Sequence, residues 1–179
     1  MNEKRIGIIG LGNVLMGDDG FGPFVVHLLE SGYSFPDNVV VSDLGTPSLD
    51  LAGYIQAFDS MIVIDAATAS GTPGELRTYD RKDIVASPLE PRITPHEPTL
   101  KEALLTAEFE GSGPKELTLV GVVPQRLGNG IGLSPPVRAA ASRAVAMIVA
   151  ELMRLGVDVQ RRPGLAAKPA WWERETVRE

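Results

Sequence analysis

Short apolar runs alternate along this chain of 179 residues with segments in which apolar residues recur every three or four positions. The short runs are typical of buried strands, and the recurring pattern is typical of helices with one buried face. The expected strands are 4–10, 39–44, 61–65, 75–79 and 116–123, and the expected helices are 21–32, 46–58, 100–107 and 134–156. Alternation of this kind builds a parallel sheet from right-handed crossovers. The sequence therefore predicts an α/β fold, a single domain with a mainly parallel twisted sheet of about five strands and helices on both faces.

Two parts of the chain depart from this pattern. Polar and apolar residues alternate strictly over 75–79, which indicates an edge strand. The periodicity ends near residue 159, so we expect the α/β domain over 1–158 and a C-terminal tail over 159–179. The tail contains both tryptophans, Trp171 and Trp172. They form either an aromatic strap packed back on the domain or a segment that docks a partner, and the sequence leaves both interpretations open.

Composition and charge exclude several classes of protein. The net charge of −6, without a clustered basic face, argues against nucleic-acid binding. Charged residues interrupt the longest apolar stretch, 137–155, so no membrane helix is expected. The absence of cysteine excludes disulfides, thiolate metal ligands and a thiol nucleophile. The N-terminal apolar run is too short for a secretory signal, so we expect a cytoplasmic protein, and a monomer is the simplest expectation.

Polar residues gather where the predicted strands end. The segment GLGNVLMGDDGFG at 10–22 follows the first strand, Asp43 and Asp65 end the second and third, and the loop carrying His96 follows the fourth. Ligands of open parallel sheets bind at the carboxyl ends of the strands, so these groups are candidates for one site.

The glycines of the first cluster do not predict a nucleotide site. The third glycine stands two residues too late for G-x-G-x-x-G, and two aspartates follow it, which would repel a pyrophosphate. Gly10 and Gly12 are therefore interpreted as a tight turn that serves the scaffold.

The titratable residues at these carboxyl ends of the strands, which we call the rim, differ in their expected roles. Asp18 is predicted to cap a helix or to support the site, whereas Asp19 is predicted to be a ligand. Asp65 is delivered to the rim by four apolar residues, and His96 is held between two prolines in PHEP. Two carboxylates and one imidazole suit a divalent ion such as nickel or zinc and leave coordination positions open. His27, the other histidine, lies among apolar helix residues and is interpreted as structural or surface.

The order of several motifs resembles the hydrogenase maturation endopeptidase family. GLGNVLMGDDGFG, VIDAA, ITPHEPTL and LTLVGVVPQ, followed by IGLSPPV, occur in order between residues 5 and 156. The resemblance implies an enzyme that removes a C-terminal extension from the large-subunit precursor of a nickel–iron hydrogenase. It implies that Asp19, Asp65 and His96 bind nickel carried by that precursor and form the catalytic set, with Asp43 as a further candidate base. Another divalent ion is able to occupy such a site.

Two departures from the family pattern and two other functions remain open. Leu44 stands where the family commonly has a glycine, which puts the role of Asp43 in doubt, and the tail from residue 160 is not covered. A general metallopeptidase would carry its own zinc and cleave short peptides. A nickel-binding assembly factor without catalytic activity would dock the same precursor and leave its mass unchanged.

Overall fold

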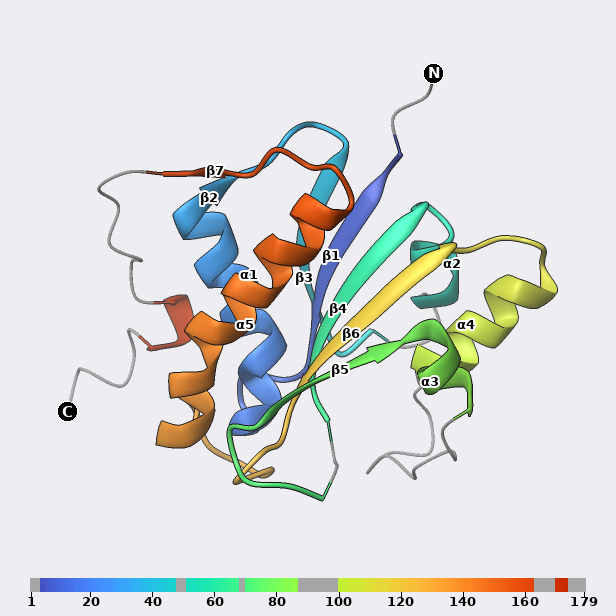
Figure 1. Ribbon diagram of the computed structural model, residues 1–179. Helices are drawn as coiled ribbons and strands as arrows, with labels where there is room; N and C mark the ends of the chain where they lie inside the picture. Colours follow the sequence, from blue (N-terminus) through green and yellow to red (C-terminus); the bar gives the residue numbers. More distant parts are fainter. Residues whose placement is uncertain (1–3, 48–50, 68–69, 87–99, 163–169, 174–179) are drawn as a thin grey trace.

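The computed structural model describes residues 4–47, 51–67, 70–86, 100–162 and 170–173. Its main sheet has five strands in the order β3-β1-β4-β6-β5 (Figure 1). These are β1 (Ile6–Leu11), β3 (Val39–Gly45), β4 (Ser60–Ala66), β5 (Leu76–Asp80) and β6 (Glu116–Val122). All neighbouring pairs are parallel except β5 with β6, which are antiparallel. The predicted α/β fold and the predicted edge strand are both confirmed.

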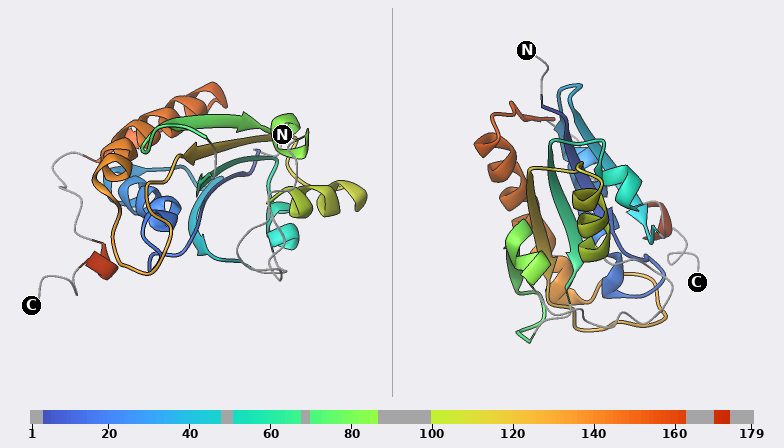
Figure 2. Two further views of the ribbon diagram at one scale, coloured as in Figure 1. Left: turned by 90° about the horizontal axis from the view of Figure 1, so that it is seen from below. Right: turned by 90° about the vertical axis from the view of Figure 1, so that its right-hand side faces the viewer.

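Helices cover both faces of this sheet (Figure 2). α1 (Phe21–Gly32) and α5 (Pro135–Arg154) pack on one face, and α2 (Leu51–Ile55), α3 (Arg81–Ala86) and α4 (Leu100–Phe109) pack on the other. Alternate side chains of β1 serve the two cores: Ile6 and Ile8 face α1 and α5, whereas Ile9 and Leu11 face α2 and α4. The strand is apolar throughout because it is buried on both sides.

The strand order fixes where a ligand site is expected. From β1 the chain continues through α1 to β3 on one side, whereas from β4 it continues toward β5 and β6 on the other. The connections that leave β1 and β4 therefore diverge at the carboxyl ends of two adjacent strands. Such a switch point opens a crevice in the sheet, which is where open α/β sheets bind their ligands.

Two helices differ from the prediction. α2 ends at Ile55 rather than near residue 58, because the chain continues in two tight turns closed by Ala57 N–H to Tyr54 O and Phe58 N–H to Ile55 O. α3 was not predicted. It begins where Asp80 and Asp83 exchange hydrogen bonds, each carboxylate accepting the backbone N–H of the other at 2.9–3.1 Å. This reciprocal pair is a capping box, and the D-x-x-D spacing is its sequence signal.

The described part of the tail packs against the domain. β7 (Gln160–Arg161) pairs antiparallel with β2 (Tyr33–Ser34), and Trp172 is 6% exposed within the core beside α1. Its ring contacts His27 edge to face, with 6.1 Å between the ring centroids. The strap interpretation is confirmed for Trp172 and the structural interpretation for His27, whereas Trp171 is 65% exposed.

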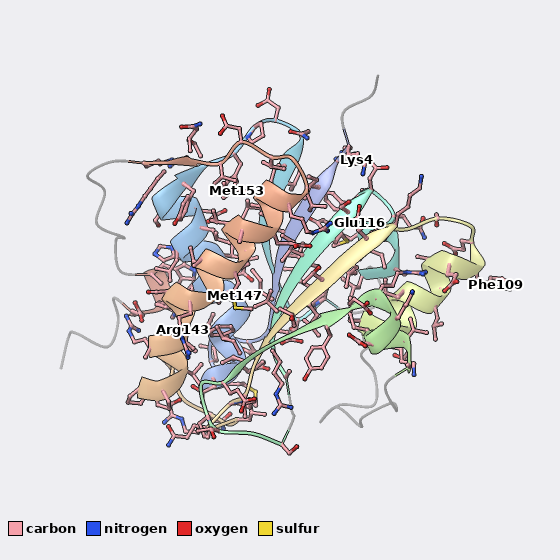
Figure 3. All side chains as sticks on the ribbon, in the orientation of Figure 1. Lys4, Phe109, Glu116, Arg143, Met147 and Met153 are labelled. Carbon is pink, nitrogen blue, oxygen red and sulfur yellow. The ribbon has the colours of Figure 1, made fainter. Side chains whose placement is uncertain are left out.

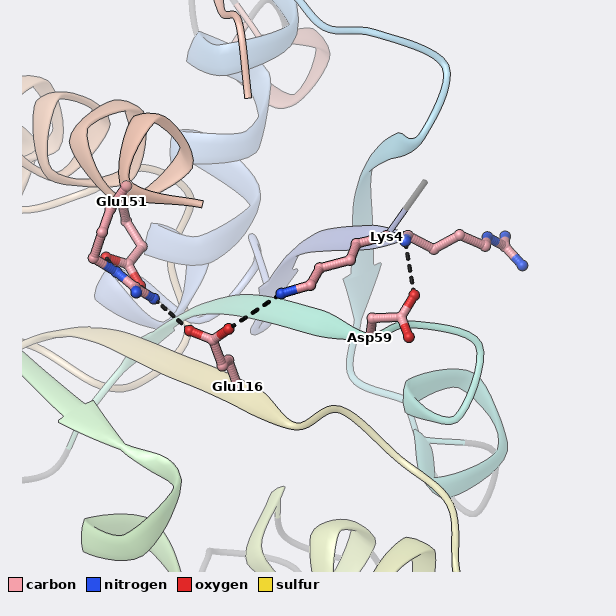
Figure 4. Close-up of polar contacts among 6 residues, drawn as sticks. Lys4, Asp59, Glu116 and Glu151 are labelled. Carbon is pink, nitrogen blue, oxygen red and sulfur yellow. Dashed lines mark hydrogen bonds and ion pairs between the residues drawn. The ribbon is translucent and has the colours of Figure 1, made fainter. Parts of the chain in front are cut away.

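Charged side chains gather at the amino ends of the strands (Figure 4). Lys4 Nζ and Arg154 Nη2 lie 3.7 and 2.7 Å from the two carboxylate oxygens of Glu116, and Arg154 Nε lies 2.9 Å from Glu151. Hydrogen bonds from Arg154 hold the pKa of Glu116 and that of Glu151 below the ordinary value.

Within the described residues, no helix is both long and apolar enough to cross a membrane.

Candidate functional site

The turn after β1 brings the first acidic candidate back against the strand end. Gly12 has a φ of +125°, and a Cβ on it would lie 1.8 Å from the carbonyl oxygen of Asp19. Only glycine satisfies both conditions. The interpretation of Gly12 as scaffold is therefore confirmed, and the contact explains how the 3-10 turn Asp18–Gly20 (η1) folds back onto the end of β1.

Asp19 is half-buried in this turn. Its Oδ2 accepts a hydrogen bond of 2.8 Å from the backbone N–H of Asn13, which immediately follows Gly12. The bond fixes the carboxylate beside the carboxyl end of β1. η1 also lies against β4, the strand that carries Asp65.

Asp65 is the next to last residue of β4 and is 6% exposed. Its Oδ1 accepts a 2.8 Å hydrogen bond from the N–H of Ala66. Because Gly10 pairs with Ile64, Asp65 stands level with Leu11 at the end of β1. The structure thus brings Asp19 and Asp65 to the ends of the two strands that flank the switch point.

Asp43 lies on the opposite side of β1, in register with Gly10. It is exposed, and its Oδ1 accepts a 2.8 Å hydrogen bond from the N–H of Gly45. The register between β1 and β3 shifts here, because Leu11 pairs with Gly45 and Leu44 is left as an extra residue. The residue that departs from the family pattern is therefore the extra residue of a β-bulge, which bends the strand at its end.

His96 lies outside the described residues, in 87–99. The sequence argument carried its loop to the rim because the loop follows the fourth strand of the predicted sheet. That step does not hold, because this strand is β5, which runs antiparallel to the others. It ends at Asp80, beside the amino ends of the parallel strands rather than their carboxyl ends. Over the residues described, no three His, Cys, Asp or Glu side chains are close enough to hold a metal ion.

Asp18 was predicted to cap a helix or to support the site, but sequence reasoning did not identify its partners. It is fully buried, and its carboxylate accepts the backbone N–H groups of Gln125, Arg126 and Ser134 and the hydroxyl of Ser134, at 2.7–2.9 Å. The prediction of a helix cap is wrong for the helix that follows, whose N-cap is Gly20. Ser134 does stand at the N-cap of α5, but its hydroxyl is bonded to Asp18 rather than to the helix.

The loop 124–134 therefore lies beside the loop that carries Asp19. Backbone hydrogen bonds reinforce the contact, from Gly17 N–H to Gly130 O at 2.7 Å and from Gly130 N–H to Leu15 O at 2.9 Å. Leu15, Leu127 and Ile131 are exposed on these two loops. Phe109 and Met153, also exposed, project instead from two separate helices (Figure 3).

Comparison with known proteins identifies the family. The model of the family HycI, hydrogenase maturation protease, matches residues 23–151, which is most of the chain. The chain belongs to the hydrogenase maturation protease family. The matched residues include Asp43, Asp65 and His96, and Asp19 precedes them.

Relatives and solved structures resemble the chain over nearly its whole length. It is 35% identical over 162 residues to the hydrogenase 2 maturation protease of Escherichia coli (strain K12), which covers 90% of this chain and 98% of that protein. It is 37% identical to the hydrogenase expression/formation protein HupM of Azotobacter chroococcum mcd 1, with 94% and 81% covered. The structure of the hydrogenase maturating endopeptidase HybD from E. coli matches with a TM-score of 0.80 at 34% identity, covering 88% of this chain and 98% of that one. Membership of this protease family makes the chain a hydrolase of peptide bonds.

Proposed function

We propose that this chain is an endopeptidase that removes the C-terminal extension of the large-subunit precursor of a nickel–iron hydrogenase. The observation that carries the proposal is the position of Asp19 and Asp65, at the ends of the two strands flanking the switch point of a hydrogenase maturation protease. Two carboxylates at the carboxyl ends of these strands can act on a bound peptide.

Nickel already inserted in the precursor is the recognition element in this proposal, and so it is part of the substrate. Asp19, Asp65 and His96 supply two carboxylates and an imidazole, a donor set that suits a divalent ion of intermediate hardness. The Oδ2 atom of Asp19 accepts the backbone N–H of Asn13, and a carboxylate offers about four acceptor positions, so Asp19 fits a further partner. Three protein ligands leave positions for groups of the precursor.

The groups at the rim are proposed to have different chemical roles in cleavage. Nickel held between the two proteins supplies a Lewis acid that polarises the scissile carbonyl or a water. Asp19 and Asp43 are the two candidates for a general base. Each accepts one backbone hydrogen bond, but Asp19 is half-buried in a turn that lies against β4, whereas Asp43 is exposed beside a β-bulge on the other side of β1, which favours Asp19.

The test is incubation of the purified chain with nickel-loaded and with metal-free precursor, followed by measurement of the intact mass of both. We expect cleavage of the loaded precursor only. Equal cleavage of both would remove nickel from the recognition step, and an unchanged mass would leave a non-catalytic assembly factor. Stoichiometric zinc in the purified chain, together with cleavage of short peptides, would support a general metallopeptidase.

Matched variants test the residues. We expect Asp65→Asn and His96→Ala each to lower processing by at least about 100-fold, since even the groups that orient metal ligands are commonly worth about 10–100-fold. Asp59→Asn is the control, because Asp59 is exposed just before β4, at the end of that strand opposite Asp65. Its carboxylate accepts a hydrogen bond from the N–H of Arg5. It should process precursor at the wild-type rate. A loss of thermal stability that accounts for the loss of processing in Asp65→Asn would instead assign Asp65 a structural role.

A further inference from the structure

The carboxylate of Asp18 joins two segments of the chain that are far apart in sequence, the turn η1 and the loop 124–134. It stands in the turn η1 next to Asp19, and its partners Gln125, Arg126 and Ser134 lie more than a hundred residues later. Ser134 is also the N-cap of α5, so the negative charge lies at the N-terminus of a 20-residue helix. The Asp18 carboxylate therefore lies at the positive end of the helix dipole, which is a favourable position for an acidic side chain.

All four hydrogen bonds described for this carboxylate have the carboxylate as acceptor. Oδ2 accepts from Gln125 N–H, Arg126 N–H and the Ser134 hydroxyl, and Oδ1 accepts from Ser134 N–H. An asparagine in the same place has only one oxygen. Whichever way its amide is turned, the NH₂ group faces at least one backbone N–H, so donor meets donor. Replacement of a single oxygen is therefore enough to disrupt the junction without changing its size.

We propose that Asp18 is a positioning residue for the reaction, and that it acts by holding the turn that carries Asp19 against the loop 124–134. The proposal rests on the proposed function, because it assigns Asp18 a part in the same cleavage. Asp18 is fully buried and Asp19 is half-buried. One aspartate of the pair therefore anchors the turn, and the other faces the rim. If the anchor is released, η1 can shift relative to β4, and Asp19 moves relative to Asp65.

The experiment compares Asp18→Asn with wild type in two measurements at a temperature well below both melting points. The first is the kinetics of cleavage of nickel-loaded precursor. Misplacement of a reacting group by about 1 Å lowers rates by about 10²-fold. We therefore expect kcat to fall by about 10- to 100-fold with little change in KM.

The second measurement is hydrogen exchange of single backbone amides by NMR. The amide of Asn13 donates to Asp19, so its protection reports the position of that carboxylate. In Asp18→Asn we expect faster exchange at Asn13, Gln125 and Arg126, while amides of the central strand residues Ile62 and Val63 keep their protection.

Two further variants separate positioning from stability. Ile148→Ala removes a fully buried side chain about 20 Å farther along α5 than Ser134, so it lowers stability without touching the rim. It should keep the wild-type kcat and the protection of Asn13. Ser134→Ala removes one of the four hydrogen bonds and leaves the three backbone bonds, so a smaller loss of kcat is expected.

The outcomes are distinct. An unchanged kcat in Asp18→Asn, unchanged protection at Asn13, or equal losses in Asp18→Asn and Ile148→Ala would each overturn the positioning role. If wild type itself does not cleave the precursor, the proposed function fails. The exchange of the Asn13 amide then still decides whether Asp18 holds Asp19 in place.

Discussion

The contact between α1 and the sheet can be tested by adding one methyl group at Gly22. A Cβ on Gly22 would lie 2.3 Å from the carbonyl oxygen of Leu11 and 2.5 Å from that of Ile64. Both atoms are backbone, at the ends of β1 and β4, so neither can turn aside as a flexible side chain would. In Gly22→Ala the first turn of α1 must therefore move away from the two strand ends.

The expected magnitude follows from the geometry. Overpacking of a well-packed core costs about 1–3 kcal/mol or more, and contacts with backbone oxygens place this site at the upper end, at about 3 kcal/mol. For a chain of this size about 1 kcal/mol corresponds to about 2–4 °C, so the melting temperature should fall by about 6–12 °C. Cleavage of precursor should fall as well, because Asp19 lies just before this turn.

Gly32→Ala is the matched control, because Gly32 ends the same helix and a Cβ on it meets nothing within 4 Å. Alanine is favoured over glycine in a helix by about 0.5–1 kcal/mol, so this variant should melt at the wild-type temperature or about 1–4 °C above it. Both can be measured by thermal denaturation followed by circular dichroism. If Gly22→Ala melts with wild type, or if the two variants shift together, the close approach of α1 to the strand ends is refuted.

Trp172→Ala should lower the free energy of unfolding by about 3–5 kcal/mol, whereas the exposed Trp171→Ala should change it by less than about 0.5 kcal/mol, in urea unfolding. Equal effects would contradict the strap. Arg154→Gln should lower stability slightly at neutral pH, because Arg154 holds the pKa of Glu116 and Glu151 below the ordinary value. This contribution is present above about pH 4.3, the unfolded value, and is lost as the pH falls through the lowered folded values. Melting temperatures of wild type and variant between pH 3 and 7, about the range of that titration, should therefore converge at the acid end. A constant difference would contradict the ionic origin.

The sequence was sufficient to predict those helices and strands in which buried apolar residues recur at regular spacing. β1, α1 and α5 were predicted because burial imposes a regular apolar pattern on them. α3 has one buried side chain, Ile84, and is held by the local bonds of its cap, so periodicity could not reveal it. β2 and β7 have two residues each and pair across most of the chain, which leaves no local signal.

The candidate site shows a similar division. Asp65 was found because a carboxylate after an apolar strand is conspicuous, and the structure brings it to the switch point with Asp19. The separate roles of Asp18 and Asp19 could not be derived in full, because the geometry of η1 decides which of two adjacent carboxylates turns inward. The partners of Asp18 come from a loop more than a hundred residues away, and only tertiary structure joins them. The direction of β5 was equally hidden, since an edge strand has the same pattern in either orientation.

The charged cluster around Glu116 lies at the amino ends of the strands, whereas Asp65 lies at the carboxyl end of β4 and Asp19 beside that of β1. The length of the buried strands thus separates these ion pairs from the residues proposed to carry out the cleavage. Substitutions at Lys4, Glu116 and Arg154 should therefore change stability and its dependence on pH and salt, while the geometry around Asp19 and Asp65 stays the same.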